Sequence, residues 1–180
     1  MNQDSHGIFV ARDERGAFVR VNGRGTFQNA QSLREFGVEA LNQGCPAISF
    51  DLADCQGMDS TFLGVLAGFG LKLRALGRKD ALYLYNTGGR NFECCQTLGL
   101  DRLARLEAGP PNASETQPPP ASQFRKLADS DVSGSAKRDK SATAAMMLEA
   151  HEDLCECDQG NEAKFNDVKR LLRTQVEGQR

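Results

Sequence analysis

Apolar runs of strand length alternate with longer stretches of helical spacing along residues 7–106. One stretch, residues 47–52, forms the apolar run AISFDL, which is typical of a buried strand. Another, residues 60–76, carries apolar side chains at three- and four-residue steps and predicts a helix that Gly77 ends. The full pattern predicts strands at 7–12, 17–21, 47–52 and 81–85, helices at 29–42, 60–76 and 90–98, and an optional edge strand at 103–106.

The order of these elements indicates the class of fold. The first two strands are separated by the turn-forming residues DERG, which is typical of a hairpin. The later strand–helix–strand units require crossover connections, which are right-handed in nearly all proteins. We therefore expect one α/β domain over residues 1–108, built on a mixed β-sheet with helices.

Proline and small polar residues dominate the segment that follows. Five of the six prolines lie between residues 110 and 120, and no apolar pattern persists through residues 109–140. Such a composition cannot bury enough apolar surface to offset the entropy lost on ordering. We expect a flexible Pro/Ser-rich linker at 109–140.

Helical spacing of apolar residues returns in the last segment, residues 141–180. Two apolar stripes are interrupted at 158–161, which predicts a C-terminal helical hairpin with one apolar face. This face could pack within the hairpin, on the domain, on a second copy of the chain or on another protein; the alternative is a disordered tail with transient helicity. The residues expected on it are Met147, Leu148, Leu154, Phe165, Val168 and Leu172.

Composition narrows the classes of function. Hydrophobic residues make up 39% of the 180 residues and the formal net charge is −2, so no broad cationic surface favours nucleic acid. No apolar run approaches the roughly 18 residues of a membrane span, and the N-terminus lacks the pattern of a secretory signal. The six cysteines are then expected to be reduced thiols. These observations predict a soluble, cytoplasmic protein that binds neither nucleic acid nor membrane.

The most informative motif lies at the start of the second predicted helix, where residues 58–66 read Met-Asp-Ser-Thr-Phe-Leu-Gly-Val-Leu. Asp59 is a favourable N-cap residue. A phosphoryl group on Ser60 would meet free backbone N–H groups and the positive helix end, and would add about −1.5 to −2 charges beside Asp59. The alternative is that Asp59, Ser60 and Thr61 only cap the helix.

In this setting the chain resembles the STAS family, the domain of bacterial anti-sigma factor antagonists. Members have an apolar strand ending in Asp, as at Asp51, and then Met-Asp-Ser-Ser/Thr-Gly-Leu-Gly-x-Leu at the head of the second helix, as at residues 58–66. Gly77 before the strand ALYLYN and the sequence Leu-Gly-Leu-Asp at 98–101 agree further. The resemblance covers about residues 7–107 and implies a STAS-like fold there.

The resemblance also implies a function, that of an anti-sigma factor antagonist. The unphosphorylated protein binds an anti-sigma factor with serine-kinase activity and frees a sigma factor; the kinase phosphorylates the serine, here Ser60, and a phosphatase reverses this. The partner interface then includes Asp51, Asp59, Thr61 and Phe62. ATP belongs to the kinase, so the chain needs no cofactor and is not an enzyme. The alternatives are a STAS subunit of a membrane-transport ATPase complex and a ligand-sensing STAS module.

The chain departs from the family pattern at two places. Members often have Gly-x-Leu/Ile-Asp after the second strand, whereas residues 23–27 read Gly-Arg-Gly-Thr-Phe, without an acid. Phe62 replaces the glycine that usually follows the Ser-Ser or Ser-Thr pair. Its spacing fits two placements equally, an exposed ring that contributes to partner choice or a member of the core stripe with Leu66 and Phe69.

Other candidates for chemistry are weak. His151, Cys155 and Cys157 have the residue types of metal ligands, but a fourth ligand is unclear, and we expect no metal site. Gly64 and Gly68 are expected to let their helix approach the sheet closely rather than to pack helices in a membrane.

Overall fold

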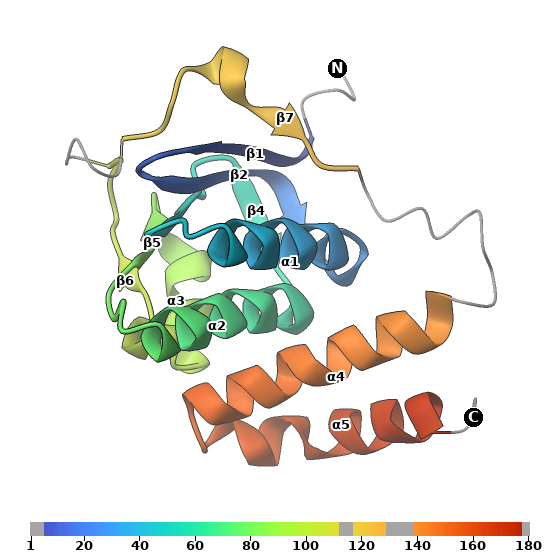
Figure 1. Ribbon diagram of the computed structural model, residues 1–180. Helices are drawn as coiled ribbons and strands as arrows, with labels where there is room; N and C mark the ends of the chain where they lie inside the picture. The colour runs from blue at the N-terminus through green and yellow to red at the C-terminus, as the bar shows by residue number, and fades with distance from the viewer. Residues whose placement is uncertain (1–5, 112–116, 129–138, 178–180) are drawn as a thin grey trace.

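A mixed β-sheet forms the centre of the molecule (Figure 1). The computed structural model describes residues 6–111, 117–128 and 139–177. Within these ranges the sheet has seven strands in the order β6-β5-β3-β2-β1-β7, and β4 pairs with β2 off this path. The strands are β1 (Gly7–Asp13), β2 (Gly16–Gly25), β3 (Ile48–Asp51), β4 (Cys55–Met58), β5 (Leu82–Tyr85), β6 (Arg105–Leu106) and β7 (Arg125–Lys126).

The pairing of the strands follows from the connections between them. A tight turn joins β1 to β2, and these strands pair antiparallel from Gly7↔Asn22 to Asp13↔Gly16. Strands β2, β3, β5 and β6 pair in parallel, as helical crossovers require. The predicted mixed α/β sheet is confirmed. Strand β4 was not predicted, because its sequence CQGM has neither an apolar run nor a regular alternation.

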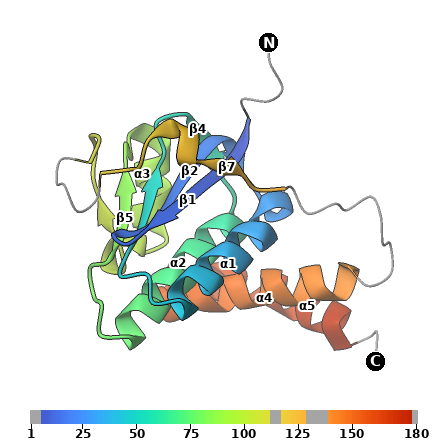
Figure 2. The same cartoon turned by 45° about the horizontal axis from the view of Figure 1, so that its top comes forward.

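The helices form two further layers on one side of the sheet. Helices α1 and α2 lie against the sheet, α4 packs on the outer side of α2, and α5 packs on α4 (Figures 1 and 2). The third helix, α3, follows β5 and leads into the short 3-10 helix η2 (Leu100–Arg102). The helices are α1 (Phe27–Asn42), α2 (Ser60–Ala75), α3 (Gly89–Thr97), α4 (Asp139–Cys157) and α5 (Asn161–Glu177).

Phe62 belongs to the hydrophobic core between the sheet and α2. Its side chain is 0% exposed, so the placement of Phe62 as an exposed docking ring was wrong and the core placement is confirmed. The ring lies over Gly25, where an added Cβ would come within 2.7 Å of it. The lack of a side chain at Gly25 therefore provides the space that this ring fills.

Part of the segment expected as a flexible linker adds to the sheet. Residues 117–128 contain the 3-10 helix η3 (Ala121–Gln123) and β7, which pairs antiparallel with β1. Leu127 beyond this strand is buried in the core. The expected linker also included residues 139–140, which instead begin α4, and its positions 112–116 and 129–138 lie outside the described residues.

The C-terminal segment forms two helices, and their apolar residues differ from the expected set. Leu154 and Leu172 are buried as expected, but Val168 is 38% exposed and Met147, Leu148 and Phe165 are only partly buried. Helix α4 instead buries on α2 a face that mixes small, polar and apolar residues, so this face lacks the apolar periodicity by which it could be predicted. The buried residues of this face include Ala144, Met146, Ala150 and His151.

Candidate functional site

Asp59 closes the start of α2 and joins it to the start of α1. Its Oδ1 accepts a hydrogen bond from the backbone N–H of Phe62 at 2.9 Å, and its Oδ2 accepts one from the N–H of Phe27 at 2.8 Å. Both donors belong to first helical turns, where N–H groups have no partner within the helix and a carboxylate is favoured by the helix dipole. Asp59 therefore holds two helix ends in place with both carboxylate oxygens.

Ser60 follows this cap and makes a hydrogen bond to a buried histidine of α4. The Ser60 Oγ lies 3.0 Å from Nε2 of His151, whose side chain is 2% exposed. The other ring nitrogen, Nδ1, lies 2.7 Å from the carbonyl oxygen of Met147, which can only accept. Nδ1 therefore carries a proton and donates it to this carbonyl oxygen, and in the neutral tautomer that this bond selects Nε2 accepts from the Ser60 hydroxyl.

This pair was not predicted from the sequence. Ser60 and His151 are 91 positions apart, and they meet only because α4 crosses the start of α2. The structure thus assigns His151 a place beside the predicted phosphoacceptor, and leaves it out of the weak metal set considered above. Cys157 of that set donates instead to the carbonyl oxygen of Gly99 at 2.9 Å, and the described residues hold no cluster of three His, Cys, Asp or Glu suited to a metal.

Two glycines of α2 let α4 come into backbone contact. A Cβ added at Gly64 would lie 2.2 Å from the carbonyl oxygen of Ala150, and one at Gly68 would lie 2.4 Å from a carboxylate oxygen of Asp153. We expected these glycines to bring α2 close to the sheet, which was wrong. They face the opposite way, and the missing side chains admit α4.

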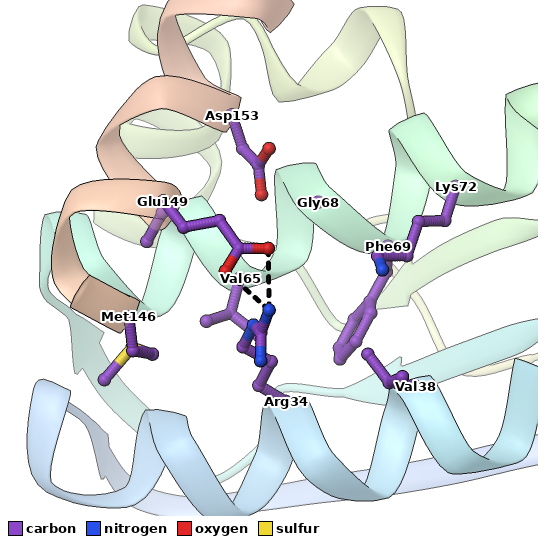
Figure 3. Close-up of a pocket in the computed structure, with 10 residues that line it drawn as sticks. Arg34, Val38, Val65, Gly68, Phe69, Lys72, Met146, Glu149 and Asp153 are labelled. Atoms are coloured by element: carbon purple, nitrogen blue, oxygen red, sulfur yellow. Dashed lines mark hydrogen bonds and ion pairs between the residues drawn. The ribbon is translucent and has the colours of Figure 1, made fainter. Parts of the chain in front are cut away.

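Charged side chains from α1, α2 and α4 line the cavity at this helix contact (Figure 3). Arg34 of α1 donates to both carboxylate oxygens of Glu149 of α4, at 2.6 and 2.5 Å. Burial raises the pKa of Asp153 to about 7, the carboxylates of Glu149 and Glu156 add to the rise, and Lys72 and Arg34 oppose it. The cavity between the three helices has a volume of about 10 Å³, room for one water at most. The contact is therefore closely packed and leaves no space for a substrate.

The other residues predicted for the interface lie in different surroundings. Asp51 ends β3, where its Oδ1 accepts from Asn86 Nδ2 at 2.7 Å and its other oxygen lies 3.8 Å from Arg20. Thr61 is 3% exposed, and Phe62 is in the core. The structure thus brings Asp59 and Ser60 together at the edge of the molecule formed by the start of α2. It places Asp51 with the ends of the neighbouring strands.

An exposed aromatic ring does lie at this edge, but it is Phe27. Its side chain is 41% exposed, and its amide is the one bound by Asp59. An exposed phenylalanine beside a capped helix end is a feature that protein interfaces use, because aromatic rings bury large areas on binding. Sequence reasoning missed Phe27 as an interface residue, because it appeared there only within the segment 23–27 that departs from the family pattern.

Ser60 and His151 have the geometry of a nucleophile and its base, but the surroundings oppose catalysis. His151 is enclosed by α4 and by the ring of Phe165, whose centroid is 4.9 Å away. His151 is only 2% exposed, and Ser60 and Met147 engage both of its ring nitrogens. What the arrangement can do is hold α4 on α2 through the Ser60 hydroxyl.

Comparisons with solved structures find similar folds at low identity. The anti-sigma factor antagonist SpoIIAA, in its unphosphorylated form, matches with a TM-score of 0.48 and 17% identity over 61% of this chain and 91% of that chain. The chain is similar to this antagonist in its fold. A candidate antagonist from Thermotoga maritima matches with a TM-score of 0.49 and 19% identity, over 54% of this chain and 83% of that chain.

A third match is an uncharacterized protein of the DUF3478 family from Shewanella loihica, described as having a SpoIIAA-like fold. Its TM-score is 0.36 and its identity 15%, over 59% of this chain and 88% of that chain. No family model and no curated protein matches the sequence. These similarities concern the fold, to which this chain adds α4 and α5. None of the described helices is long and apolar enough to cross a membrane.

Proposed function

We propose that the chain is a protein-binding module of the anti-sigma factor antagonist type, switched by phosphorylation of Ser60. The observation that carries this proposal is the position of the Ser60 hydroxyl in the first turn of α2, directly after the N-cap Asp59. Backbone N–H groups without helical partners surround this position, and they favour a phosphate.

Ser60 is the better acceptor of the two hydroxyls in the motif. Thr61 is 3% exposed, whereas Ser60 is half-buried and lies at the edge of the molecule. Asp59 keeps its carboxylate fixed beside Ser60 through two hydrogen bonds. A phosphate there adds about −1.5 to −2 charges beside the Asp59 carboxylate, which weakens the binding of a partner by like-charge repulsion and desolvation.

The partner proposed for the unphosphorylated form is an anti-sigma factor with serine-kinase activity, and a phosphatase restores binding. The exposed ring of Phe27 beside Asp59 supplies an apolar contact for this partner. The kinase supplies ATP, so this chain contributes only the hydroxyl and the surface around it.

The proposal is tested with the full chain, ATP and the anti-sigma factor kinase of the same genome. Wild-type chain should incorporate one phosphate at Ser60, located by peptide mass spectrometry, and lose affinity for the kinase at least tenfold. Ser60→Ala should bind and remain unlabelled, while Thr61→Val, the matched control, should label as the wild type does. Stoichiometric labelling of Ser60→Ala would contradict the assignment. Stable association with a transport ATPase, without labelling, would favour the transporter alternative.

A further inference from the structure

The contact between α2 and α4 runs along one face of α2. Ser60, Gly64 and Gly68 are spaced four residues apart, so they lie one above another on that face. Opposite them, α4 presents His151, the backbone of Ala150 and the carboxylate of Asp153. The hydroxyl proposed as phosphoacceptor is thus the first member of the same strip that holds the C-terminal hairpin.

This strip has no room for a phosphate on Ser60. The Oγ and Nε2 of His151 are 3.0 Å apart, a separation filled by the hydroxyl proton alone. Phosphorylation removes that donor and places three oxygens where the ring of His151 now lies. His151 is only 2% exposed, so its ring is enclosed on the other sides. The carboxylate of Asp153 on α4 faces Gly68, two helical turns further along the same strip of α2, so a phosphate on Ser60 adds charge of the same sign to this contact. Added negative charge therefore repels α4.

We propose that the α4–α5 hairpin is a gate over Ser60, so that the docked hairpin and a phosphate on Ser60 exclude each other. The inference rests on the proposed function for the identity of the modification, and it adds the regulation of that site. Linkage makes the exclusion reciprocal: docking lowers access to Ser60, and charge on Ser60 favours the undocked hairpin by the same factor. Release of α4 also uncovers apolar residues of α4 that are now buried, which include Met146 and Leu154.

Amide hydrogen exchange of the full chain, read by mass spectrometry over residues 144–154, tests the gate without any kinase. Ser60→Glu should speed exchange of these amides at least tenfold while β3 and β5 keep wild-type rates. Gln56→Glu, which adds the same charge at an exposed position of β4, should leave them unchanged. Wild-type exchange of α4 in Ser60→Glu, or slower exchange through pairing with a protonated His151, would overturn the gate.

A second pair of variants tests the release of the hairpin by substitutions in α4 itself. Ala150 is 2% exposed and meets α2, whereas Ala145 of the same helix is exposed. Ala150→Glu should release α4 and raise the rate of Ser60 phosphorylation by the kinase at least tenfold, while Ala145→Glu should do neither. Equal phosphorylation rates in wild type and Ala150→Glu would overturn the gate and leave the proposed function intact. Release of α4 by Ser60→Glu without phosphorylation of Ser60 in any variant would refute the proposed function and support the gate.

Discussion

The carboxyl of Asp153 should make the docking of α4 dependent on pH. Burial against α2 raises its pKa from 3.8 to about 7, with Glu149 and Glu156 adding to the rise. A carboxyl whose pKa is raised in the folded state holds its proton longer there than in the unfolded chain. Its contribution to the stability of the docked state is therefore full below about pH 4 and is lost as the pH rises through about 7. Docking should weaken as the pH rises from about 4 to about 7.

The size of the effect follows from the shift. A rise of about 3 pKa units corresponds to about 4 kcal/mol at 1.36 kcal/mol per unit. Asp153 is only partly buried and Lys72 and Arg34 lie near it, so solvent and these cations screen much of that energy. We expect about 1–2 kcal/mol, which corresponds to a factor of about 5–30 in the equilibrium between docked and undocked α4.

Asp153→Asn removes the titration and keeps the size of the side chain. In the full chain at pH 8, exchange of the α4 amides, corrected for the intrinsic rate at each pH, should be about 5–30 times slower in Asp153→Asn than in wild type. Below about pH 4 the two proteins should agree, because Asp153 is then mostly protonated whether α4 is docked or undocked. Asp167→Asn, at an exposed position of α5, is the matched control and should change neither rate.

Two results would refute this reasoning. Equal exchange of wild type and Asp153→Asn at pH 8 would show that the carboxylate is solvated in the docked state. Faster exchange of Asp153→Asn at every pH would show that the carboxylate stabilises the contact through Lys72 and Arg34, and that the sign assigned here is wrong.

Three further predictions concern the same contact and the core beneath it. Phe62→Ala should lower the free energy of unfolding by about 3–5 kcal/mol in urea, and exposed Phe27→Ala by less than about 1 kcal/mol; equal losses would contradict the core placement. Gly64→Ala should gain about 1 kcal/mol of helix propensity, yet it should speed amide exchange of α4, because the new Cβ meets the backbone of α4. The control Gly88→Ala, which has open space around it, should leave α4 exchange unchanged. Unchanged α4 exchange in Gly64→Ala would refute the backbone contact. His151→Ala should destabilise α4 docking by about 1–2 kcal/mol through the lost hydrogen bond, and unchanged exchange would rule out a role for that bond.

Local sequence patterns were enough to predict the class of fold and part of the candidate site. The apolar run before Asp51 predicted β3, and the helical spacing from residue 60 predicted α2 to within a residue. Asp59 was identified as a cap because the free N–H groups of a helix end select short polar side chains wherever they occur. Such signals depend on residues close together in the chain, so they can be recognised from the sequence without knowing how the elements pack.

Contacts between distant segments were decided only by the tertiary structure. The side on which Phe62 lies depends on the space above Gly25, and the role of Gly64 depends on which helix crosses it. The pairing of Ser60 with His151 across 91 positions requires α4 to dock on α2. Periodicity states that a residue faces a neighbour but not which neighbour, because the same small side chain admits a sheet or a helix equally well. The covering of Ser60 is therefore a property of the assembled layers and of no single segment.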